Sequence, residues 1–175
     1  MIKIIDGNLF DSKANFIVHQ VNCQSVMGSG VAAQVAELFP NVEHEYLRYC
    51  KHCKKNKINM LGTVQYVPTE TWANVMCDTM KNERVEAYDK NYQYIVNLFG
   101  QDTFGMGVQQ TNLKAVKMGM MDIREKAEKI GATVAMPYMI ESFRGGADWN
   151  DMYKIIQNVF GKSVVDVEIW KLNLK

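Results

Sequence analysis

Three loops rich in glycine and polar residues occupy positions at which folded chains commonly carry functional side chains. They span residues 22–30, 100–111 and 137–148, and each follows a predicted strand and precedes a predicted helix. Loops of this kind, at the carboxyl edge of a parallel sheet, commonly form ligand sites. Glycine lets the backbone approach a ligand closely, and the N–H groups of a first helical turn attract anions. The pattern therefore predicts a ligand that carries phosphate.

His19 lies in the predicted strand 16–21, just before the first of these loops begins at Asn22. The ordinary pKa of histidine is close to neutral, so a histidine here could act as a general base or a nucleophile. The alternative is a strand histidine that is hydrogen-bonded within the core. The residues by themselves leave both interpretations open.

Gly28, Gly30 and Ala33 have the spacing of the dinucleotide-binding fingerprint. In that motif the first glycine directly follows a strand, and an acidic residue closes the next strand about 20 residues later. Here several residues separate Val21 from Gly28, and the chain at that distance is predicted to be helical and basic. The lysine and spacing of a P-loop are absent too. We therefore expect no cofactor.

The chain has four cysteines, at positions 23, 50, 53 and 77. A structural zinc site would need a second close pair of ligands beside Cys50 and Cys53, and Cys23 and Cys77 are isolated. Cys50 and Cys53 also lie on the apolar stripe of a predicted helix. We expect reduced, packed thiols and no metal; a zinc site is the alternative.

The elements that position these residues follow from hydrophobic periodicity. Strands are predicted at 2–10 with a break at Gly7-Asn8, and at 16–21, 62–67, 92–99, 133–136 and 165–170. Helices are predicted at 31–39, 41–55, 112–130 and 149–160. Pro40 is expected to end the first helix and Asp148 to cap the last. Residues 68–89 have no clear pattern. Because helices and strands interleave, we expect one α/β domain over residues 1–175, with a largely parallel central sheet covered on both faces.

Composition limits the function further. Lysine and arginine number 20 and aspartate and glutamate 19, so the surface cannot be globally basic and nucleic acid is not an expected partner. The basic segment 51–57 ends a predicted helix, where cations complement the helix dipole; an anion patch that binds RNA is the alternative. We found neither a membrane-spanning apolar run nor a signal-peptide pattern, so we expect a cytoplasmic protein with no membrane partner.

Residues 17–32 closely resemble the first ligand loop of macro domains, ADP-ribose-binding modules built as an α/β/α sandwich around a mixed sheet. Further similarity lies in the opening element, a leucine-glycine strand entry, the second phosphate loop with its helix, and the final strand: residues 6–10, 61–64, 135–149 and 168–172. The resemblance spans almost the whole chain. It is greatest to the branch with the terminal ADP-ribose protein glycohydrolase and the fungal ADP-ribose-1''-phosphate phosphatase.

Carried over by position, the resemblance implies a role for each site residue. Asn8 would read adenine in place of the family's aspartate, Leu9 would supply a backbone contact, and Trp170 would lie beside adenine or else fill the core. Asn22 would face the distal ribose, with His19 as the second catalytic residue. The remaining ligand contacts would come from the two loops: Met27, Gly28, Ser29, Gly30 and Val31, then Ser142, Phe143, Arg144, Gly145 and Gly146.

Departures from the family bear on turnover. The glycohydrolase branch has a catalytic lysine at the end of the strand that matches residues 94–99, and this chain has none there. Gly145 replaces that branch's partner aspartate. Glu141 and Phe143 replace glycines that approach the phosphates, whereas Arg144 could clamp them. A lysine-adduct mechanism is therefore not expected.

We predict that the chain binds ADP-ribose or a related NAD-derived nucleotide. We further predict that it hydrolyses an ADP-ribosyl ester or ADP-ribose-1''-phosphate. The alternative is a non-catalytic reader of ADP-ribosylated macromolecules, or a sponge for a nucleotide signal. His19 and Asn22 favour the enzyme, while the missing lysine and the altered second loop favour the alternative.

Overall fold

The computed structural model describes residues 1–69, 90–105, 109–140 and 146–172. The strands are β1 (Ile2–Asp6), β2 (Phe16–Asn22), β3 (Val64–Pro68), β4 (Tyr94–Gln101), β5 (Val134–Pro137) and β6 (Val167–Lys171). The helices are η1 (Leu9–Asp11), a short 3-10 turn, and α1 (Gly30–Leu38), α2 (Pro40–Asn56), α4 (Leu113–Ile130) and α5 (Trp149–Phe160). The alternation of helices and strands that the sequence predicted is therefore confirmed.

Within the described residues the strands form one six-stranded sheet in the order β1-β6-β5-β2-β4-β3. The pairs from β1 to β4 are all parallel, and β3 alone pairs antiparallel with β4. The sheet is thus mixed and largely parallel, as predicted. The parallel strands end at one edge, and the loops that follow β2, β4 and β5 are the three glycine-rich loops of the sequence.

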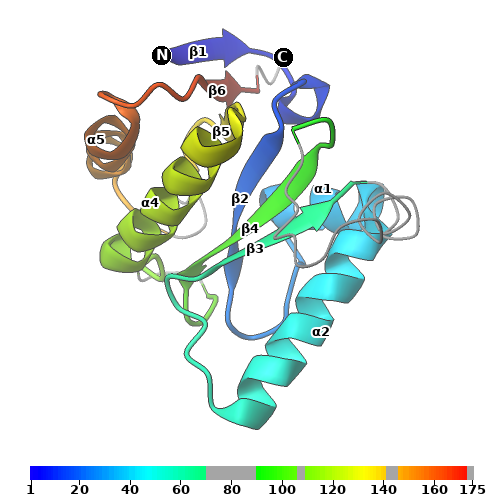
Figure 1. Cartoon of the computed structure of the whole chain (residues 1–175). Helices are drawn as coiled ribbons and strands as arrows, with labels where there is room; N and C mark the ends of the chain where they lie inside the picture. The colour runs from blue at the N-terminus through cyan, green and yellow to red at the C-terminus, as the bar shows by residue number, and fades with distance from the viewer. Residues whose placement is uncertain (70–89, 106–108, 141–145, 173–175) are drawn as a thin grey trace.

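Helices cover both faces of the sheet, which gives three layers (Figure 1). On one face, α4 and α5 close a large apolar core that includes Phe16, Val96 and Met120. On the other face, α1 and α2 cover two smaller clusters, one around Val35 and one around Tyr46. The prediction of a three-layer α/β/α sandwich is confirmed.

Local chain chemistry explains both ends of α4 and the start of α5. The Asn112 side chain accepts a hydrogen bond from the Ala115 amide at the start of α4, and Gly131 ends that helix with φ +68°. The Asp148 carboxylate accepts from the amides of Asn150 and Asp151 at the start of α5, as predicted for a cap.

One predicted helix starts a residue earlier than expected, and one part of a predicted strand was wrong. α1 ends before Pro40 as predicted, but α2 begins at Pro40 and not at Asn41, because proline at the first helical position lacks an N–H that would be unpaired there anyway. Residues 9–11 form a 3-10 turn instead of continuing the first strand, because the Asn8 side chain accepts from the Phe10 amide and turns the chain. The uncharacterised stretch 68–89 lies almost entirely outside the described residues.

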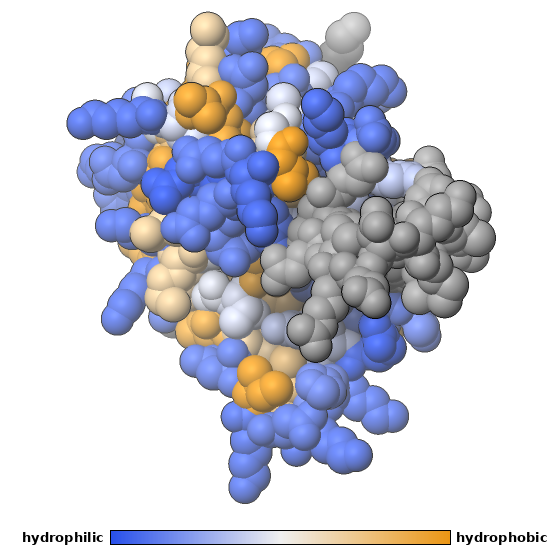
Figure 2. Space-filling model, in the orientation of Figure 1, coloured by the Kyte–Doolittle hydropathy of each residue, from blue (hydrophilic) through white to orange (hydrophobic). Residues whose placement is uncertain are grey.

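Hydrophilic side chains dominate the face of the molecule in Figure 2, with hydrophobic side chains scattered among them. Over the described part of the chain, no helix combines the length and the apolar character needed to cross a bilayer.

Candidate functional site

Asn22 shapes the first loop. Its Oδ1 accepts from the Gln24 amide at 2.9 Å and lies 3.4 Å from the Val26 amide, while its Nδ2 donates to the Val26 carbonyl at 2.7 Å. The side chain is only 5% exposed. These bonds close a tight turn directly after β2, in which Ser25 takes a left-handed conformation with φ +67°. The predicted catalytic asparagine therefore holds the loop together from within.

The exposed crest of the loop leads straight into α1. Gly28, Ser29 and Gly30 are exposed, and Gly30 has φ +58°. Ser29 occupies the N-cap position of α1, but its side chain makes no capping hydrogen bond and the first turn holds no acidic residue. The positive end of the α1 dipole therefore faces this crest, and the first turn of the helix itself supplies no carboxylate to neutralise it.

The loop after β4 lies against the first loop. The Cys23 amide donates to the carbonyls of Gln101 and Asp102, each at 3.1 Å, and the Gln24 side chain donates to the Asp102 carbonyl at 3.2 Å. Two of the three glycine-rich loops are thus joined by hydrogen bonds at one edge of the sheet.

Leu9, Val31 and Trp170, three residues that the sequence assigned to the ligand site, belong to one cluster. Leu9 is 6% exposed, whereas Val31 and Trp170 are half-buried. A Cβ placed on Gly7, whose φ is +148°, would come within 3.0 Å of the Trp170 ring, so the chain before Asn8 passes close to that ring. Trp170 lies on the face opposite Val165, Val167 and Ile169, as its alternation predicted.

Asn8 is exposed and caps η1 through its Oδ1, 3.1 Å from the Phe10 amide. Met27 is 6% exposed and belongs to the same buried cluster as Tyr46, so its side chain anchors the loop in the core. Gly146 is exposed with φ +73°. The other predicted contacts of the second loop, Ser142, Phe143, Arg144 and Gly145, together with Glu141, lie outside the described residues.

His19 sits in a polar row that crosses the sheet. Its Nε2 lies 2.6 Å from Asn97 Oδ1, and the Asn97 Nδ2 donates to Gln65 Oε1 at 3.0 Å. The Gln65 side chain then donates to the Glu45 carbonyl of α2 at 2.9 Å. His19 is 1% exposed, and its Nδ1 has no hydrogen-bond partner among the described residues. Burial lowers its pKa to about 4, against the opposing effect of the Asn97 bond, so His19 is neutral at pH 7.

Two residues near the site were missed from the sequence. Glu168 Oε2 accepts from the Ser12 hydroxyl at 2.6 Å and from Trp170 Nε1 at 2.8 Å, so it fixes the tryptophan ring. Tyr46 places its hydroxyl within hydrogen-bond distance of Asn22 and Val26. Its position on the apolar stripe of α2 was a usable signal, because a buried tyrosine hydroxyl needs a partner.

The cysteines that the structure describes are free thiols in the core. Cys23, Cys50 and Cys53 are all buried in the cluster around Tyr46 and Phe99, which confirms the predicted packing on the helix stripe. Burial, with the nearby charge of Asp102, raises the pKa of Cys23 to about 12, so it is no nucleophile at neutral pH. Cys77 lies outside the described residues, and among the described ones no group of histidine, cysteine and acidic side chains could hold a metal.

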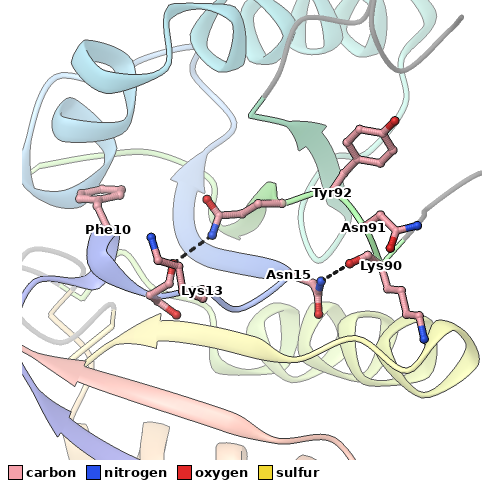
Figure 3. Close-up of a pocket in the computed structure, with 8 residues that line it drawn as sticks. Phe10, Lys13, Asn15, Lys90, Asn91 and Tyr92 are labelled. Carbon is pink, nitrogen blue, oxygen red and sulfur yellow. Dashed lines mark hydrogen bonds between the residues drawn. The ribbon is translucent and has the colours of Figure 1, made fainter. Parts of the chain in front are cut away.

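A pocket of about 340 Å³ lies elsewhere, where the chain enters β2 and β4 (Figure 3). It is lined by Phe10, Ser12, Lys13, Asn15, Lys90, Asn91, Tyr92 and Gln93. Figure 3 shows the two lining segments facing each other, joined where the Asn15 Nδ2 donates to the Lys90 carbonyl at 2.6 Å. Since these segments precede their strands, the pocket lies away from the glycine-rich loops, and no predicted site residue lines it.

Comparison with solved structures identifies the fold. The macrodomain of Mycobacterium tuberculosis DarG matches with a TM-score of 0.73 at 22% identity, over 97% of each chain. Thermosipho africanus DarTG in complex with ADP-ribose matches with a TM-score of 0.73 at 22% identity, over 99% of this chain and 42% of that one. The chain is a macrodomain in fold.

Comparison with curated proteins agrees with this assignment, although no family model matches the chain. A DNA ADP-ribosyl glycohydrolase of Thermus aquaticus is 23% identical over 97% of this chain and 40% of its own length. An ADP-ribose 1''-phosphate phosphatase of Saccharomyces cerevisiae is 31% identical over 70 residues, 39% of this chain and 38% of that protein. The chain thus aligns with only about two fifths of the length of either curated relative.

Proposed function

We propose that this macrodomain binds ADP-ribose, or a nucleotide that contains it, at the edge of the sheet where β2 and β6 end. The observation that carries the proposal is the start of α1, where an exposed glycine-serine-glycine crest precedes an uncapped first turn without acidic residues. Backbone N–H groups and the helix dipole suit such a turn to a diphosphate.

The hydrophobic cluster beside α1 suits the adenosine half of the ligand. Val31, in the first turn of α1, and Trp170 share this cluster with Leu9, which follows Asn8. With the diphosphate on α1, adenine would lie by Trp170 and Asn8, whose amide oxygen can accept from the adenine amino group. The complex of Thermosipho africanus DarTG with ADP-ribose, similar in fold, supports this choice of ligand.

Hydrolysis is the second candidate, and the observation that favours it is that the two curated relatives described above are named for it, one as a glycohydrolase and one as a phosphatase. Asn22 and His19 are the proposed catalytic residues. Binding is the better supported of the two activities, because the Asn22 side chain is hydrogen-bonded inside the loop and His19 is buried and bonded to Asn97. A catalytic His19 would act as a neutral imidazole.

Calorimetric titration with ADP-ribose tests binding, with ADP as the control that lacks the distal ribose. Saturable binding that is tighter for ADP-ribose supports the proposal, and the absence of binding to either nucleotide overturns it. Phosphate release from ADP-ribose-1''-phosphate, and ADP-ribose release from an ADP-ribosyl ester, test turnover. If the domain is an enzyme, His19→Ala abolishes turnover and spares binding; unchanged turnover in that variant removes His19 from the mechanism.

A further inference from the structure

Tyr46 of α2 reaches the turn of the first loop from behind. Its hydroxyl donates to the Asn22 carbonyl at 2.7 Å, lies 3.1 Å from Asn22 Oδ1 and accepts from the Val26 amide at 3.1 Å. One hydroxyl thereby contacts both ends of the turn that Asn22 closes. These bonds come from a helix that is 24 residues away along the chain from Asn22.

The tyrosine is itself held rigidly. It is fully buried, and its ring stacks on Phe99 of β4 with the ring centroids 5.8 Å apart. Burial raises the pKa of the Tyr46 hydroxyl, so it keeps its proton and remains a donor over the physiological range. A rigid donor in a dry environment gives its acceptor a well-defined position.

The turn needs stabilising contacts from outside the loop, because its backbone conformation is unfavourable. Ser25 has φ +67°, a left-handed conformation that costs energy in residues with a side chain. Its hydroxyl also accepts from the Lys54 Nζ at 3.2 Å, a second contact from α2. Met27 packs into the cluster that contains Tyr46, so the base of the loop is anchored while its crest, from Gly28 to Gly30, is exposed.

From this geometry we propose that Tyr46 is the positioning residue of the ligand loop: its hydroxyl fixes the Asn22–Val26 turn and thereby sets where the crest presents the first turn of α1. The inference deepens the proposed function and rests on it for the identity of the ligand. It assigns to Tyr46 no contact with the ligand and no step in a reaction.

Tyr46→Phe tests the proposal, with Tyr49→Phe as the matched control. Tyr49 lies one turn further along α2 and also packs on Phe99, but its hydroxyl faces Thr63 Oγ1 at 3.4 Å, away from the loop. Phenylalanine keeps the ring and removes one hydroxyl in each case. We expect Tyr46→Phe to weaken ADP-ribose binding about tenfold, because loss of the buried hydrogen bonds that this hydroxyl makes to Asn22 and Val26 loosens the loop. Tyr49→Phe should bind as the wild type does.

Amide hydrogen exchange separates a failure of this inference from a failure of the ligand proposal. In the wild type, the Val26 amide should be protected without any ligand, and Tyr46→Phe should remove that protection while Tyr49→Phe preserves it. Equal Val26 exchange in all three proteins would overturn the role of Tyr46, even if ADP-ribose binds. Loss of protection in a domain that binds no ADP-ribose would support the clamp and reject the ligand.

Discussion

The two faces of the sheet are built differently. Under α4 and α5 the buried side chains form one continuous apolar cluster, which includes Phe16, Val18 and Val96. Under α1 and α2 the apolar side chains fall into two clusters, and the row from His19 through Asn97 to Gln65 lies on this same face. Both faces use the same strands, because alternate residues of a strand point to opposite sides.

This difference indicates that the two faces contribute differently to stability and to the precise alignment of the strands. A continuous apolar core gives the larger share of the stability, since each buried side chain gains from its removal from water. A buried polar row contributes less net stability, but its hydrogen bonds require one particular alignment of neighbouring strands. The face with the polar row also carries α1 and the first loop, so precise alignment is found where a ligand is proposed to bind.

The largest expected effect comes from breaking the apolar face. Phe16 is fully buried and packs against the rings of Tyr66 and Tyr94, with centroids 5.2 and 5.9 Å away. Phe16→Ala should lower the free energy of unfolding by about 4 kcal/mol, because it leaves a large cavity. Denaturant titration measures the loss. Phe104→Ala, at a position 55% exposed, is the control and should cost less than about 1 kcal/mol. Similar losses in the two variants would contradict the described core.

The apolar face was also the easier one to predict. Residues 113–130 repeat apolar side chains every three or four positions and are followed by glycine, so α4 was placed within one residue. Pro40 ends α1 as predicted, but its second role at the start of α2 was missed, because a proline is compatible both with the end of one helix and with the first turn of the next. Sequence patterns identify a helix more reliably than they choose between such local alternatives.

The polar row should make stability depend on pH. The His19 pKa is lowered from about 6.5 to about 4 by burial, so the unfolded chain binds a proton between these values and the folded chain does not. The contribution of neutral His19 is therefore complete above pH 6.5 and is lost as the pH falls toward 4. Over that window the free energy of unfolding should fall by about 3 kcal/mol on account of this residue.

Denaturant titrations at pH 7 and pH 4.5 measure this loss. His19→Gln should reduce the difference between the two pH values, because glutamine does not titrate. His44→Gln, at an exposed position of α2, should leave the difference as it is in the wild type. If His19→Gln and the wild type lose the same stability on acidification, the assignment of a buried, neutral imidazole to His19 is wrong.

The site was predictable in parts and for identifiable reasons. The loop 22–30 stands out by its composition, and the alternation along β6 placed Trp170 on the correct face. The contact of His19 with Asn97 could not be predicted, because it depends on β2 lying beside β4, which is not its neighbour along the chain. The contact of the Tyr46 hydroxyl with the first loop could not be predicted either, because a hydrophobic stripe does not reveal which backbone groups a hydroxyl will meet.

The N-termini of α5 and α1, which lie on opposite faces of the sheet, offer tests with smaller expected effects on stability. Asp148, at the start of α5, accepts from the Asn150 and Asp151 amides at 2.8 and 3.3 Å. Asp148→Ala should lower the free energy of unfolding by about 1 kcal/mol, whereas Asp148→Asn should keep most of the cap. Thermal or chemical denaturation compares them. An equal loss in both variants would show that the charge of Asp148, and not its capping bond, stabilises the helix.

The smallest expected change in stability is a gain, and it comes from giving α1 the carboxylate that α5 already has. Ser29 occupies the N-cap of α1 without a capping bond. Ser29→Asp should raise the free energy of unfolding by about 0.5 kcal/mol, because a carboxylate complements the helix dipole. The same charge would repel a diphosphate, so ADP-ribose binding should weaken by at least about tenfold. Ser29→Asn supplies a cap without the charge and should gain stability with little loss of binding. If aspartate and asparagine weaken binding equally, size and not charge matters at this position, and the diphosphate does not lie on the first turn of α1.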